Sequence, residues 1–182
     1  SSNLTLRDLS FSIKDAGYLD TSGSFLFLPR SISLTMVSST IAASASSTSL
    51  TALSIDALSS IDASGRGCPR SEGADNGSGP DLTTGICAIG NSGSGIGGGG
   101  SGAGGGGAAH GGAGGAGAGV SGNSSTYGLS THPAFFGSSG GGGYYIGSAP
   151  GGGAGGIIDL VISGTLTVNG SLKANGTNGV YG

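Results

Sequence analysis

The chain has 182 residues, of which 44 are glycine and 32 serine, and it carries six Lys or Arg, nine Asp or Glu and no tryptophan. So few basic residues, without a cluster, exclude the electrostatic footprint of a nucleic-acid-binding protein. No apolar stretch is long enough to cross a bilayer, so the sequence predicts no membrane span.

The N-terminal third alternates apolar and polar residues, as half-buried β-strands require. Phe11 and Ile13, and later Leu34 and Met36, are each flanked by polar residues. Residues 25–28 are apolar throughout, which predicts a fully buried strand. The spacing in residues 50–61 fits either a strand or a helix.

An internal comparison favours the strand for that ambiguous segment. Residues 60–65 (SIDASG) align with residues 171–176 (SLKANG) at an offset of 111, and each copy ends in a glycine-containing turn. One strand module therefore occurs twice, as in a repeat protein.

The segment from Ile158 to Gly176 has the clearest pattern, because its even positions are apolar or glycine and its odd positions are mostly polar. Gly164, Gly170 and Gly176 predict bends that keep the same face inward, and successive bends in one direction make a solenoid. We therefore expect an all-β fold, a parallel β-helix.

The predicted β-helix has two parts that flank a large insertion. Residues 1–67 and 157–182 supply its strands, and the end of the second part begins a further repeat. Residues 68–156 form the glycine-rich insertion.

Cys68 and Cys87 enclose a segment with Gly, Pro, Asp and Asn, which is flexible enough to let them meet. A disulfide would stabilise the fold by about 3 kcal/mol and indicates an oxidising compartment. The alternative is two unrelated buried thiols. A metal site is poorly supported, because no Cys-x-x-Cys pair or neighbouring His pair exists.

The glycine-rich stretch leaves several interpretations open. Glycine makes up most of the segment from Gly93 to Gly119, without the strict triplet of collagen. The first three interpretations are a flexible linker, a set of phosphate-cradling loops and an irregular loop. The fourth is a bundle of extended polyglycine or polyproline II segments joined by N–H···O and Cα–H···O bonds. The interspersed aromatic residues favour an ordered layer.

No arrangement of residues indicates catalysis, so we expect a protein that is not an enzyme and binds no cofactor or metal. His110 and His132 lie in no nucleophile or metal-ligand motif, and the carboxylates are scattered. Residues 75–81 offer oxygen ligands but lack the spacing of an EF-hand, which favours a polar turn.

N-glycosylation sequons are the most informative chemical motif. Asn169 and Asn175 fall on outward positions of the alternating pattern, where a glycan could project. Asn-Gly is also a common turn, which is the alternative for these two and for Asn76. The five sequons begin at Asn3, Asn76, Asn123, Asn169 and Asn175.

The strand module at residues 60–67, the polyglycine stretch, the aromatic segment 127–140 and residues 163–176 together resemble the large glycine-rich, pectin-lyase-like β-helix surface proteins. The resemblance covers roughly residues 50 to 180 and brings no catalytic residues. It implies a secreted, repetitive, glycosylated molecule of the extracellular space or cell surface.

These observations predict a structural subunit of an extracellular filament or cell-surface appendage, which contacts copies of itself and carries covalent glycans. The alternative is a surface adhesin or carbohydrate-binding module that stacks sugars on aromatic side chains. The residues of that surface would be Tyr127, Phe135, Phe136, Tyr144 and Tyr145.

Overall fold

The fold is described here from a computed structural model, which covers the greater part of the chain. The described residues are 10–13, 18–28, 33–70, 76–84, 87, 98–99, 101–102, 105–110, 113–118, 120–121, 125–128, 131, 133–143 and 149–180. Within these ranges the only regular secondary structure is β-strand, and there is no helix. The all-β prediction is therefore confirmed.

In the described part of the chain seven strands form one sheet, and every pairing between them is parallel. The strands are β1 (Ser10–Ile13), β2 (Tyr18–Leu28), β3 (Ser33–Met36), β4 (Thr40–Ile55), β5 (Ser60–Asp62), β6 (Ile158–Val168) and β7 (Ser171–Lys173). Residues 50–61 contribute to β4 and β5, so their interpretation as strand is confirmed.

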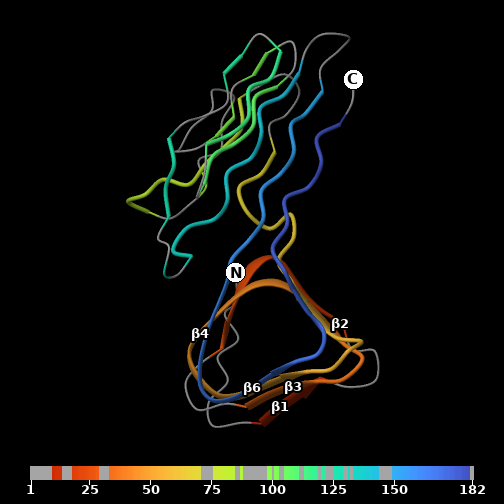
Figure 1. Ribbon diagram of the computed structural model, residues 1–182. Coiled ribbons are helices and arrows are strands. Elements are labelled where there is room, and N and C mark those ends of the chain that lie inside the picture. The colour runs from red at the N-terminus through yellow and green to blue at the C-terminus, as the bar shows by residue number, and fades with distance from the viewer. Residues whose placement is uncertain are drawn as a thin grey trace. The chain divides into compact units, whose positions relative to one another are not determined.

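The chain divides into two compact units. Unit 1 comprises Ser1–Ala63 and Ile158–Ala174 and holds all the strands, whereas unit 2 comprises Ser64–Ile157 and Asn175–Gly182. In Figure 1 the strands of unit 1 surround a common interior instead of lying in one flat layer.

The strands of unit 1 pair in three sets. The first set joins β1, β3, residues 52–55 of β4 and residues 165–168 of β6. The second set joins residues 18–20 of β2, the start of β4, β5 and β7. The third set joins residues 25–28 of β2, residues 44–47 of β4 and residues 158–160 of β6.

Paired positions within each set recur at offsets of 19 to 23 in residue number before the glycine-rich unit. Ser33 pairs with Ala52 at an offset of 19, and Thr40 pairs with Ser60 at an offset of 20. Ala52 pairs with Thr165 at an offset of 113. Ser64–Ile157 belongs to unit 2, and when that segment is left out of the numbering the last offset is again 19.

The internal sequence alignment corresponds to real strand neighbours. β5 pairs with β7 through Ser60–Ser171, Ile61–Leu172 and Asp62–Lys173, which is the offset of 111 read from the sequence. Upstream the offset differs by two positions, because Ile55 pairs with Val168 at an offset of 113. The difference arises at the turns, since the turn after β4 is longer than the turn after β6.

The core of unit 1 is a column of apolar side chains from β2, β3, β4 and β5, because the pleat of a strand turns alternate side chains to the same face. Buried residues in β3 alternate with half-buried Ser33 and Thr35. The partly buried Ile158, Leu160 and Ile162 of β6 pack against this cluster. The buried members are Leu26, Leu34, Met36, Ile41, Ala43, Ala45, Leu50, Leu53, Ile55 and Ile61.

Glycines in β6 and the following turn behave differently from one another. Gly170 lies in the turn between β6 and β7, and a Cβ there would overlap the carbonyl oxygens of Ser59 and Asp56. The strand continues through Gly164, with a shift of register in the β4–β6 pairing around it. The predicted bend is therefore found at Gly170. At Gly164 β6 is continuous as a strand, but it passes there from the third set, at residues 158–160, to the first set, at residues 165–168.

Unit 2 is held together by backbone hydrogen bonds between extended segments that are neither helix nor sheet in its described part. Gly137 and Gly140 both donate to the segment around residues 152–155, at 3.2 and 2.9 Å. Ser139 donates to Ser78 at 2.8 Å, and Gly141 donates to Gly106 at 3.0 Å. Successive residues of segment 137–141 thus donate to different neighbouring segments. The segment at residues 152–155 accepts a bond from Gly137 and again, three residues later, from Gly140.

These segments approach so closely that side chains would not fit between them. A Cβ at Gly77 would overlap the carbonyl oxygen of Ser139, and one at Gly105 would overlap that of Gly141. Because only glycine lacks a Cβ, it alone allows this approach of two backbones. The described part of the glycine-rich stretch is therefore packed, which argues against a flexible linker.

Candidate functional site

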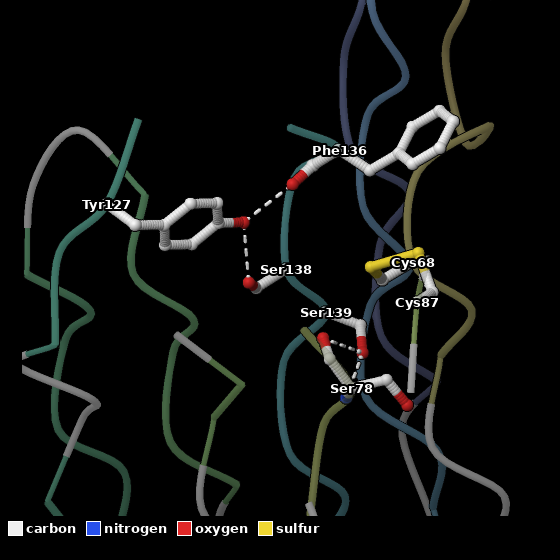
Figure 2. The surroundings of a disulfide bond; sticks show 7 residues. All are labelled: Cys68, Ser78, Cys87, Tyr127, Phe136, Ser138 and Ser139. Carbon is white, nitrogen blue, oxygen red and sulfur yellow. Dashed lines mark hydrogen bonds between the residues drawn. A yellow bond between two sulfur atoms is a disulfide. The ribbon is translucent and has the colours of Figure 1, made fainter. Parts of the chain in front are cut away.

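The disulfide lies in unit 2, where Cys68 and Cys87 are bonded with their Cα atoms 5.2 Å apart (Figure 2). Cys68 is buried, and its backbone bridges two segments by donating to Gly137 at 3.1 Å and accepting from Ala154 at 3.2 Å. The prediction of this disulfide is confirmed. It cross-links the start of unit 2 to Cys87, which forms an isolated antiparallel bridge with Pro80.

The hydroxyl of Ser139 takes the place of a backbone hydrogen-bond partner of Ser78 in the same region (Figure 2). The Ser139 hydroxyl accepts a hydrogen bond from the Ser78 amide at 2.7 Å, while the Ser139 amide donates to the Ser78 carbonyl at 2.8 Å. Both residues are buried. A serine is tolerated in this packed layer because its hydroxyl satisfies a backbone group that would otherwise be unpaired.

Tyr127 is the centre of an aromatic cluster within unit 2. Its ring packs edge-on against His110 at 4.5 Å and Phe135 at 6.4 Å between centroids. Its hydroxyl donates to the Phe136 carbonyl and pairs with the Ser138 hydroxyl, both at 2.7 Å (Figure 2). Burial raises the pKa of the Tyr127 phenol.

The residues that were predicted to form an aromatic surface differ in how exposed they are. Tyr127 is 8% exposed, so little of its ring faces solvent. Phe135 and Phe136 are partly buried. Tyr144 and Tyr145 lie outside the described residues, as does His132. The nearby Nε2 of His110 is buried and has no hydrogen-bond partner in the described part of the chain.

The sequons also differ in their surroundings. Asn169 and Asn175 are exposed. Asn76 is partly buried, and its side-chain oxygen accepts a hydrogen bond from the Ser101 amide. Asn3 and Asn123 lie outside the described residues.

A carboxylate that the sequence reasoning set aside fixes two successive turns of unit 1. The Asp56 carboxylate accepts hydrogen bonds from the Ser38 amide at 3.1 Å, the Leu58 amide at 3.1 Å and the Ser59 hydroxyl at 2.6 Å. The Ser59 hydroxyl in turn accepts from the Ser39 amide at 3.0 Å. The Asp-x-x-Ser spacing of Asp56 and Ser59 is the sequence signal that could have identified this turn-stabilising carboxylate.

These bonds hold the pKa of Asp56 below its usual range. The hydrogen bond from Ser59 is the largest cause, opposed by desolvation and assisted by the backbone amides of Ser38 and Leu58. Ser38 has a φ of 48°, a left-handed conformation that is uncommon for serine. The carboxylate therefore stabilises a turn that the backbone alone disfavours.

Asp81 makes a similar local turn in unit 2. Its Oδ1 accepts hydrogen bonds from the amides of Thr83 at 2.7 Å and Thr84 at 3.0 Å. These contacts lower the pKa of the carboxyl. Among the described residues no group of three or more His, Cys, Asp or Glu side chains could hold a metal ion.

The outer edge of unit 1 exposes large apolar side chains. Val161 is exposed at an odd position of β6, as the alternation requires. Leu166, Val168 and Leu172 continue the core column, so the sequence pattern predicted them to be inward. They are exposed because the described residues place no further strand against β6 and β7.

Comparison with known proteins gives no relative from which a function could be inferred. No protein-family model, curated protein or solved structure matches the chain. Among the described residues there is no helix long and apolar enough to span a membrane.

Proposed function

We propose that the chain is a structural subunit of an extracellular filament or cell-surface appendage, in which unit 1 is a coil of a parallel β-helix. The observation that carries this proposal is the parallel pairing of three strand sets at offsets of 19 to 23 residues along the chain. An array of such coils is stiff along its axis, because each coil contacts its neighbours through continuous backbone ladders.

The glycine-rich unit supplies a second packed body. Its hydrogen bonds return to the same neighbouring segment after three residues, which supports a bundle of polyproline II-like segments, since that helix has three residues per turn. Such a body needs no large apolar core. We propose that it is a spacer or docking layer of the assembly.

The disulfide supports a location outside the reducing cytosol. Structural disulfides persist in oxidising compartments, and Cys68–Cys87 lies within a packed part of unit 2. This agrees with an extracellular or cell-surface protein.

We propose N-glycosylation first at Asn169 and Asn175, because both side chains are exposed. Asn76 is a weaker candidate, since its side chain is partly buried and hydrogen-bonded. The test is intact-mass analysis of the native protein before and after enzymatic deglycosylation, with Asn169→Gln and Asn175→Gln as site-specific variants. An unchanged mass on deglycosylation would remove glycosylation from the proposal.

The filament itself is tested by negative-stain electron microscopy of the purified chain across a range of concentrations. Elongated particles that lengthen with concentration support the proposal. Monodisperse single chains at every concentration contradict it.

The alternative, a carbohydrate-binding adhesin, has less support from the described residues. Tyr127 is buried and its hydroxyl is already bonded to Phe136 and Ser138, so it offers no open face for stacking. A glycan-binding assay in which signal is lost on replacing Tyr144 and Tyr145 would favour the adhesin instead.

A further inference from the structure

The edge of unit 1 formed by β6 and β7 exposes apolar side chains whose partners in the neighbouring strands are buried. Leu53 is 1% exposed, whereas Leu166, its partner in register, is 55% exposed. Ile61 is fully buried, whereas its partner Leu172 is 45% exposed. The edge thus presents an apolar row, and among the described strands β6 pairs only with β4 and β7 only with β5.

The four strands of the first set share one residue pattern. Each begins with a small or polar residue, continues with a large apolar residue and a Ser or Thr, and ends with a large apolar residue. The four segments are Ser10–Ile13 (SFSI), Ser33–Met36 (SLTM), residues 52–55 (ALSI) and residues 165–168 (TLTV). The first and last of these are the outermost strands of the set.

We propose that the β6–β7 edge is an assembly site that takes the β1–β2 edge of a second copy of this chain, in parallel and in the register of the existing sets. The proposal rests on the proposed filament function and names the surface that forms the contact. In this register, Phe11 and Leu19 of the second copy fall opposite Leu166 and Leu172. Large apolar residues therefore occupy facing register positions at both places.

Charge at the edge favours the same partner and register. Lys173 lies opposite Asp62 within the chain. Continuing the second set, in which Asp20 pairs with Ala42, places Asp20 of the second copy opposite Lys173. Opposite charges directly across two strands stabilise the pairing, whereas like charges oppose it.

The contact joins two different surfaces of the same molecule. Such head-to-tail contacts give rings where the rotation between copies closes and open chains where it does not. Copies added in the register of the existing sets stack along the coil axis, which gives an open chain. Unpaired strand edges with flat apolar rows are the usual templates for strand addition. The edge thus accounts for both the polarity and the unlimited length expected of a filament.

The first experiment compares two lysine substitutions at similarly exposed valine and leucine positions of β6. Leu166→Lys places a charge in the apolar row, whereas Val161→Lys places it on the opposite face of the same strand, where the wild-type side chain is 50% exposed. Sedimentation velocity over a concentration series measures assembly, and circular dichroism checks that both variants fold.

We expect Leu166→Lys to raise the concentration for half-maximal assembly by about tenfold or more, since a charge would be buried without a partner. Val161→Lys should assemble as the wild type does. Equal assembly of all three proteins would overturn the assembly site while leaving the filament function intact. A wild-type chain that never assembles would overturn both.

A charge exchange then tests the register. Lys173→Asp weakens assembly, and adding Asp20→Lys to that variant restores it, because the pair is re-formed with reversed signs. Both proteins carry the same substitution beside Asp62, so the comparison cancels any effect within the chain. Assembly that stays weak in the double variant would overturn the proposed register.

Discussion

The packing of the glycine-rich unit makes a direct prediction about replacing single glycines by alanine. At Gly105 an added methyl group would overlap the carbonyl oxygen of Gly141, and neighbouring atoms of Gly141 and Gly142 leave no direction for escape. These are backbone atoms, so the strain cannot be relieved by a side-chain rotation. The adjacent Gly141–Gly106 hydrogen bond, now 3.0 Å, would have to lengthen or break.

We expect Gly105→Ala to lower the free energy of unfolding of this unit by about 2 to 4 kcal/mol, combining overpacking of about 1 to 3 kcal/mol with loss of a hydrogen bond worth about 1 kcal/mol. For a chain of this size that corresponds to a fall in melting temperature of roughly 5 to 15 °C. Scanning calorimetry measures the shift, and hydrogen exchange of peptides covering residues 105–143 locates it.

The matched control is Gly115→Ala, because an added Cβ there meets no atom within 4 Å. We expect it to be neutral or to stabilise by about 0.4 to 1 kcal/mol through a less flexible unfolded chain. Equal melting temperatures for the two variants would refute the packed layer. A flexible linker would give that result.

Three further predictions concern the disulfide and two hydrogen-bonded groups. Replacing Cys68 and Cys87 together by serine should lower the free energy of unfolding by about 3 kcal/mol, measured by urea denaturation; reductant that leaves the wild-type midpoint unchanged would contradict this. Tyr127→Phe should cost about 1 to 3 kcal/mol in the same assay, since the Phe136 carbonyl loses its donor, and a neutral result would show that the hydroxyl contributes nothing. The lowered pKa of Asp56 stabilises the fold above the unfolded-state pKa near 4, and this stabilisation is lost as pH falls through the folded-state pKa. The Asp56→Asn variant should therefore be less stable than the wild type at neutral pH and lose less stability on acidification. Thermal unfolding measured between about pH 2 and 7 checks both expectations.

The strands of unit 1 could be predicted from the sequence because alternation of apolar and polar residues reports directly on which face is buried. Leu34 and Met36 are buried within β3 as their spacing requires. The match between residues 60–62 and 171–173 even identified two neighbouring strands, since side chains stacked in one set occupy equivalent environments. Small differences in turn length were invisible to that alignment, so its offset does not hold for the pairing of β4 with β6.

The interactions that fix the turns and the glycine-rich unit could not be read from composition. Asp56 appeared as one of several scattered carboxylates, and its role depends on the amide of Ser38, in the preceding turn of the chain. Tyr127 appeared available for stacking, yet its hydroxyl is satisfied by the carbonyl of Phe136. Such pairings depend on which segments become neighbours, and a run of glycines contains no side-chain pattern that specifies this.

The chain returns to the same strand register after unit 2, and this limits the effect that length changes in unit 2 have during evolution. The chain leaves unit 1 after Ala63 and re-enters it at Ile158, and the Ala63 amide donates to the Lys173 carbonyl at 2.7 Å. The entropy of closing a loop grows only slowly with its length. Duplication or loss of glycine-rich sequence between these points therefore leaves the strand register unaltered, so the inserted body is free to vary in size while the coil that carries it stays constant.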